Sequence, residues 1–244
     1  MNPSAKREVL IDTVIPNLGA LRFNRLGLAI NYVDIALVLG FTFFIALCAQ
    51  ISIKIPTTTV PITGQTFGVL LTSGTLGSKR GTTTALLYMI LGMAGLPIFA
   101  PSSSIMKEKA LHFILPWSGT EGAVWEISSG GYIVGFILAS YIVGRLAEQR
   151  WDRGSQIVIA MILGNVAIYL VGLPWLAAFI SSGTTIPLTD LTYYDAISGN
   201  NVLDKTLRGG FYPFIAGDAI KLLLAATAFP LSWRLTKWFT NRNK

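Results

Sequence analysis

Residues 211–233, FYPFIAGDAIKLLLAATAFPLSW, form an almost entirely apolar stretch that nevertheless contains an aspartate and a lysine. Asp218 and Lys221 are three residues apart, so in a helix they would lie on the same face. The stretch is long enough to cross the hydrocarbon core of a membrane, which takes about 20 helical residues. A charge at the centre of such a helix costs roughly 2.5–3.5 kcal/mol, so the pair requires a physical reason.

The composition of the whole chain indicates a membrane protein. Its 244 residues are 52% hydrophobic and 13% charged, whereas a soluble domain is about a quarter charged. Mean hydropathy is +0.58. The net charge of +7 does not point to nucleic-acid binding, because the basic residues lie mostly between the apolar runs, where they act as topology signals.

The apolar runs predict an all-α membrane protein with six transmembrane helices in a single bundle. Residues 1–31 would form a cytoplasmic or interfacial segment, with a short interfacial helix in LGALRFNRLGLAI (18–30), before a transmembrane domain of residues 32–240. Long polar loops are expected at 101–126 and 181–210. The expected spans are residues 32–53, 64–77, 81–99, 129–146, 155–180 and 211–238.

The distribution of lysine and arginine predicts the orientation of the bundle. Thirteen of the 19 basic residues lie on the side of the two termini, five lie on the other side, and Lys221 lies within a span. Cytoplasmic loops carry an excess of lysine and arginine, so both termini are expected in the cytoplasm. The two long loops would then face outward, and long loops often carry function.

The charged pair has two explanations. Asp218 and Lys221 could be a self-neutralising pair that merely faces the bundle interior, or they could mark a binding site, as ionisable residues within membranes mostly do. Other polar and aromatic groups are expected near the same outer level, and an apolar pocket with a few such groups suits a small organic molecule. These candidates are Gln65 and Thr66 at the start of the second span, Ser129 and Tyr132 on the fourth, Asn165 and Tyr169 on the fifth, and Phe99.

Several kinds of chemistry find no support in the sequence. The single histidine, His112, has no ligand cluster around it, so we expect neither a metal site nor a cofactor. No Walker A pattern is present, and no catalytic constellation accompanies the six spans. The protein is therefore not expected to be an enzyme or to hydrolyse ATP itself.

Four stretches together make the chain resemble the BioY family, the biotin-specific S components of energy-coupling-factor vitamin transporters. They are VPITGQTFGVLL (60–71) with GSKRG (77–81), LLYMILGMAGLPIFA (86–100), SGGYIVGF (129–136), and the pair GNVAIYLVGLPWLA (164–177) and PFIAGDAIKLLLAA (213–226). The resemblance implies a six-helix bundle in the plasma (inner) membrane. It also implies a biotin pocket near the outer face, closed by the loop KIPTTTVPIT (54–63).

By this resemblance, Asp218 and Lys221 correspond to the aspartate and the lysine that the family has in its last helix. Many family members have an asparagine that contacts biotin shortly after the Gly-Leu-Pro segment, whereas this chain has FAPSSS (99–104). Ser102 or Ser103 is expected to substitute for it.

The resemblance also implies partner proteins: a transmembrane coupling subunit and two cytoplasmic ATP-binding cassette ATPases. Ala36 and Gly40 are four residues apart on the first span, a spacing of small residues that allows close helix approach, so we expect the coupling subunit to bind there. The alternative is that these small residues pack inside the bundle. Gly131 and Gly135 have the same spacing, and for them we favour internal packing.

Three alternatives for function stay open at this point. They are an S component for another small vitamin, a stand-alone secondary transporter with Asp218 as a proton or ion site, and a membrane scaffold without a ligand.

Overall fold

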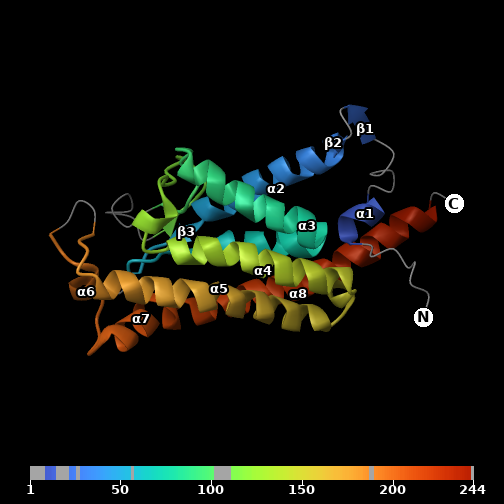
Figure 1. Cartoon of the computed structure of the whole chain (residues 1–244). Coiled ribbons are helices and arrows are strands. Elements are labelled where there is room, and N and C mark those ends of the chain that lie inside the picture. Colours follow the sequence, from blue (N-terminus) through green and yellow to red (C-terminus); the bar gives the residue numbers. More distant parts are fainter. Residues whose placement is uncertain are drawn as a thin grey trace.

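The computed structural model describes residues 9–14, 22–25, 28–55, 58–101, 111–186 and 190–242 as an elongated, mostly helical bundle (Figure 1). The long helices of the described chain are α2 (Tyr32–Gln50), α3 (Gln65–Met93), α4 (Gly130–Glu148), α5 (Gln156–Ser181) and α8 (Tyr212–Arg242). By length and composition, four segments could cross a membrane: α2, α4, α5 and residues 202–234, which include most of α8.

Helix α3 reverses direction at Gly77, so the element consists of two antiparallel arms. Gly77 has φ 82° and ψ 179°, a backbone conformation open almost only to glycine. A Cβ on Gly81 would lie 3.0 Å from the Cα of Ser73. Gln65, at the start of the first arm, and Tyr88, in the second half of the second arm, are joined by a hydrogen bond of 2.6 Å. The expected span 64–77 falls on the first arm, whereas the expected span 81–99 overlaps the second arm only as far as Met93, where α3 ends six residues earlier than predicted.

Helix α4 packs between α3 and α5, and small residues on α4 allow that approach. A Cβ on Gly135 would lie 2.9 Å from the Cα of Ile168 on α5, and one on Gly131 would lie 2.3 Å from the Cβ of Trp175. The expectation that these two glycines pack inside the bundle is therefore confirmed.

The N-terminal region differs from the sequence prediction. The strands β1 (Arg22–Arg25) and β2 (Leu28–Asn31) pair in antiparallel fashion, so the interfacial helix expected within 18–30 is wrong. The register places Phe23 opposite Ile30.

A short helix, α1 (Leu10–Val14), packs on the bundle before these strands. Its buried Ile11, together with Val9 just before the helix, packs against Leu76 and Ala147. Arg80 of α3 forms ion pairs with Asp12 of α1 at 2.8 Å and with Asp34 of α2 at 2.7 Å.

The two ends of the bundle carry different elements (Figure 1). One end, here named the α1 end, holds α1, the connection between α4 and α5 with η2 (Trp151–Arg153), and the C-terminal end of α8. The opposite end, here named the loop end, holds α6 (Tyr193–Ala196) and α7 (Val202–Gly210).

The loop end also contains the strands β3 (Ser52–Ile53), β4 (Ile62–Thr63) and β5 (Leu111–His112), and the 3-10 turn η1 (Val124–Glu126). The antiparallel order β4-β3-β5 ties the segment after α2, the segment before α3 and part of the 101–126 loop together. With these strands and the β1–β2 pair, the fold is mostly helical rather than all-α. Helix α2 ends at Gln50, three residues before the predicted end of the first span.

Candidate functional site

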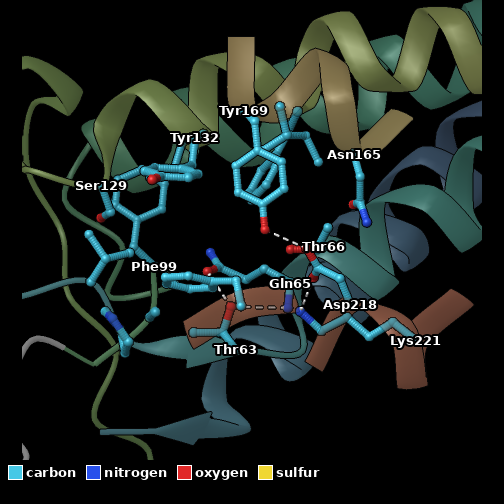
Figure 2. A pocket seen from close by; sticks show the side chains of 17 residues that line it. Thr63, Gln65, Thr66, Phe99, Ser129, Tyr132, Asn165, Tyr169, Asp218 and Lys221 are labelled. Carbon is cyan, nitrogen blue, oxygen red and sulfur yellow. Dashed lines mark hydrogen bonds and ion pairs between the residues drawn. The ribbon is translucent and has the colours of Figure 1, made fainter. Parts of the chain in front are cut away.

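A cavity at the loop end brings together residues from α3, α4, α5, α8 and the segment before α3 (Figure 2). Its empty volume is about 580 Å³, counting the part open to solvent. Nine of the eleven residues expected at or near this site line it: Gln65, Thr66, Phe99, Ser129, Tyr132, Asn165, Tyr169, Asp218 and Lys221. The other two, Ser102 and Ser103, lie outside the described residues. A role of the nine in binding stays a prediction.

Asp218 is the centre of the polar side of this cavity. The Lys221 Nζ atom donates to its Oδ1 atom at 3.2 Å, and the Tyr169 hydroxyl donates to its Oδ2 atom at 2.5 Å. The Asp218 and Lys221 side chains are only 10% and 13% exposed. Both carboxylate oxygens therefore have a donor, and the lysine charge is matched within one helical turn.

Asn165 lies one turn before Tyr169 on α5 and offers an unused acceptor. The residue is 7% exposed and lines the cavity. Its Oδ1 atom has no hydrogen-bond partner among the described residues. Because leaving a buried polar atom unpaired costs free energy, this oxygen is suited to accept an N–H group from a bound molecule.

A chain of hydrogen bonds fixes the side of the cavity formed by α3. The Thr63 hydroxyl donates to Gln65 Oε1 at 2.9 Å, and Gln65 Nε2 donates to the Tyr88 hydroxyl at 2.6 Å. Tyr88, which is fully buried, in turn donates to the carbonyl oxygen of Ile98 at 2.9 Å. Gln65 is therefore held in one orientation by both arms of α3 and by the strand before it.

Aromatic rings form the apolar wall. Tyr132 stacks on Phe214 with ring centres 6.4 Å apart, and it meets Tyr169 edge to face at 6.2 Å. Phe99 lies across the cavity, where it is 2% exposed and contacts Tyr88 edge to face. The flat surfaces of these rings suit a compact ring system in the ligand.

The segment before α3 covers the cavity and is tied to α7. Val60 and Pro61 line the cavity from this segment. The buried Thr58 hydroxyl is hydrogen bonded to the carbonyl oxygen of Gly209, and the backbone N–H of Val60 donates to the Thr58 Oγ1 atom at 3.0 Å. We call residues 58–63 the cover segment.

Helix α7 is held in place by a buried lysine. Lys205 is 6% exposed, and its Nζ atom donates to the carbonyl oxygens of Tyr194 at 2.8 Å and Ile197 at 2.6 Å. The Tyr132 hydroxyl donates to the carbonyl oxygen of Gly210 at 2.9 Å. The C-terminal end of α7 therefore orients both the cover segment and one ring of the cavity wall.

Sequence reasoning missed eight residues that line this cavity, although it expected a lid between the first two spans. Phe214 could have been found, because it lies four residues before Asp218 on the same helical face. The others depend on how the helices rotate and on the path of the loops. The missed residues are Val60, Pro61, Thr63, Ala100, Ile133, Phe136, Ile168 and Phe214.

The two residues predicted to bind a partner lie on α2 and do not line the cavity. Ala36 and Gly40 are both exposed on the bundle surface. A Cβ placed on Gly40 would meet nothing within 4 Å. Internal packing of this small-residue face, the alternative to partner binding, is therefore not seen among the described residues.

The described side chains indicate no metal site. No three histidine, cysteine, aspartate or glutamate residues gather in a way that could hold a metal ion within the described ranges. The arrangement at the cavity is that of a binding pocket: fixed hydrogen-bonding groups beside a wall of aromatic rings.

An apolar helical bundle with a covered pocket at one end defines a membrane-embedded binding protein. The chain belongs to the BioY family, whose family model matches residues 23–238. Among curated relatives, a probable biotin transporter BioY of Pyrococcus horikoshii is 31% identical over 83% of this chain and 95% of the relative. The biotin transporter BioY of Thermotoga maritima is 31% identical over 76% of this chain and 87% of the relative.

A solved structure shares the fold. The S-component for biotin from an ECF-type ABC transporter matches with a TM-score of 0.61 over 84% of this chain and 92% of that chain. The two sequences are 22% identical, so the likeness concerns the architecture of the bundle.

Proposed function

We propose that this protein is the biotin-binding S component of an energy-coupling-factor importer. It captures biotin from the outer side of the membrane for ATP-driven uptake by partner subunits. Membership in the BioY family and two relatives named as biotin transporters support the proposal. The observation that carries it is the cavity in which Asp218, Lys221 and Asn165 face a wall of aromatic rings.

The chemistry of biotin fits this cavity. Its fused rings are largely apolar, and its ureido group has two N–H donors and one strong carbonyl acceptor. Asp218 and the unpaired Asn165 Oδ1 atom can accept those N–H groups, and Lys221 can donate to the carbonyl. The rings of Tyr132 and Phe214 offer faces for the bicycle. A second pose, in which Lys221 pairs with the biotin carboxylate, uses the same charges.

The proposed topology has six spans, with both termini in the cytoplasm of the cell and the bundle in the plasma membrane. The two arms of α3 add two crossings to those of α2, α4, α5 and α8, and an even number places both termini on one side. The first arm, residues 65–76, is about 18 Å long, which is less than the roughly 30 Å hydrocarbon core. The cavity and the cover segment occupy the rest of that depth.

The proposed partners are a transmembrane coupling subunit and two cytoplasmic ATP-binding cassette ATPases. The exposed small residues Ala36 and Gly40 support a contact in which a helix of the coupling subunit lies close to α2.

Calorimetry on the purified protein tests the ligand. Biotin should bind. Thiamine and riboflavin test whether the ligand is another vitamin, and biotin methyl ester tests which group of biotin Lys221 contacts. Tight binding of thiamine or riboflavin with no binding of biotin would assign another vitamin, and a methyl ester that binds as well as biotin would favour the ureido pose. Uptake of labelled biotin in cells with and without the coupling subunit separates an S component from a stand-alone transporter.

A further inference from the structure

A second cavity lies at the α1 end, far from the candidate biotin site. It is formed where α5 begins and where α8 approaches its C-terminal end, and its empty volume is about 790 Å³, counting the part open to solvent. Trp233, in its wall, follows Asp218 by fifteen residues on α8, which is about 22 Å of helix. The lining residues are Arg153, Gly154, Ser155, Ile157, Val158, Pro230, Trp233 and Arg234. We call it the arginine cavity.

Both charged side chains that line this cavity are cationic. The Arg153 guanidinium lies over the Trp233 ring, 4.0 Å from its centre, so the stacking fixes one charge at the wall. Arg234 is exposed and forms no ion pair with any described side chain. The backbone of α5 also begins here, and Ser155 makes no capping bond with its side chain. Positive potential from the helix N-terminus therefore adds to that of the arginines.

The nearest carboxylate is turned away from solvent. Asp152 is fully buried, and it accepts a hydrogen bond of 2.6 Å from the Trp233 indole N–H. Its other oxygen is 4.0 Å from the Arg153 Nε atom. Burial raises the pKa of the Asp152 carboxyl. Asp152 bonds Trp233 and lies beside Arg153, and it forms no ion pair with Arg234.

We propose that the arginine cavity binds a phosphate group, supplied by the headgroup of an anionic phospholipid. The cationic side chains would pair with the phosphate, while Ile157, Val158 and Pro230 would contact the glycerol and the first methylene groups. The level of the cavity on the bundle fits this ligand. It lies at the start of α5 and near the end of α8, where the proposed topology puts the membrane–water interface and where tryptophan and arginine are favoured.

Native mass spectrometry in detergent can test this site with three probes: phosphatidylglycerol, phosphatidylcholine and inorganic phosphate. The variants are Arg153→Gln, Arg234→Gln and the double substitution. Lys79→Gln is the matched control, because it removes one exposed charge at the same end of the bundle without touching the cavity. Each arginine removed should weaken phosphatidylglycerol binding about fivefold, and both together about 25-fold.

The control should keep its phosphatidylglycerol affinity within about twofold of wild type. If inorganic phosphate binds as well as phosphatidylglycerol, with the same dependence on the arginines, the phosphate site stands and its source is soluble. Wild-type phosphatidylglycerol affinity in a folded double variant would overturn the proposal, and so would an equal loss in Lys79→Gln. Melting temperature reports the fold of each variant. If substitutions at Arg153 destabilise the protein, the Arg234→Gln variant alone provides the test, because the Arg234 side chain is exposed.

Discussion

Lys221 lies one helical turn beyond Asp218, and its Nζ atom is 3.2 Å from one oxygen of a carboxylate whose other oxygen is hydrogen bonded to Tyr169. A second ion pair has a similar separation in sequence. Asp204 and Arg208 lie four residues apart on α7, and their charged atoms are 2.8 Å apart. The Arg208 side chain is 54% exposed, whereas that of Lys221 is 13% exposed. Water screens the first pair, so it contributes little, whereas removing one partner of the buried pair leaves a charge without compensation.

Asp218→Asn and Lys221→Met should each weaken biotin binding at least about 30-fold, because truncating one member of a buried, hydrogen-bonded charge pair costs upwards of 2 kcal/mol. Calorimetry on purified protein measures the loss. Asp204→Asn and Arg208→Met are the controls, and both should bind like wild type. Unchanged affinity in the Asp218 and Lys221 variants would remove this cavity as the biotin site.

Tyr169→Phe should weaken biotin binding about tenfold, with little change in the fold. The substitution keeps the ring that packs against Tyr132 and removes only the donor to Asp218, and a hydrogen bond to a charged group contributes about 1.5–3 kcal/mol. Tyr212→Phe is the control, since Tyr212 is 53% exposed and does not line the cavity. Equal affinities of the two variants would show that the Tyr169 hydroxyl has no part in orienting Asp218.

Thr58→Val should loosen the cover segment. The valine keeps the shape of threonine but lacks the hydroxyl that bonds Gly209 and Val60, and a net loss of about 1 kcal/mol makes opening roughly fivefold more frequent. Hydrogen exchange of residues 58–63 in lipid nanodiscs should be faster than in wild type, and biotin should slow it. Thr58→Ser, which keeps the hydroxyl, is the control. Exchange that is the same with and without biotin in wild type would argue against a lid.

Helical periodicity was sufficient to predict the groups that share a helix in the cavity. Asp218 and Lys221 are three residues apart and Asn165 and Tyr169 are four apart, and each pair faces the cavity. The expected level of both pairs near the outer ends of their spans placed them in one site, and the family resemblance assigned Asp218 and Lys221 to it. The resemblance also pointed to the cover segment, although not to the residue of α7 that holds it.

Contacts between distant segments could not be predicted from the sequence. Thr58 meets Gly209 across 151 residues, and β3 pairs with β5 although nothing in the apolar pattern indicates strands of two residues. Tyr88 looked like an ordinary residue of an apolar run, yet it supports Gln65 because α3 reverses at Gly77. The strands β1 and β2 were mistaken for a helix because short apolar runs fit either period.

Ala36→Leu and Gly40→Leu should leave biotin affinity unchanged and strongly reduce uptake. Both residues are exposed on α2, so a larger side chain has space within this chain, and affinity should stay within about twofold of wild type. A partner helix that needs close backbone approach would be held away, and no hydrophobic drive compensates in lipid, because lipid is as apolar as leucine.

The measurements are biotin calorimetry on the purified variants, copurification of the coupling subunit, and uptake by cells. Ala178→Leu is the matched control, because Ala178 is likewise an exposed alanine, on α5 rather than α2. It should copurify with the coupling subunit and take up biotin as wild type does. Loss of binding together with loss of fold in the α2 variants would mean that the face is needed within the bundle. Full uptake by the α2 variants would mean that the coupling subunit docks elsewhere or that the protein transports biotin alone.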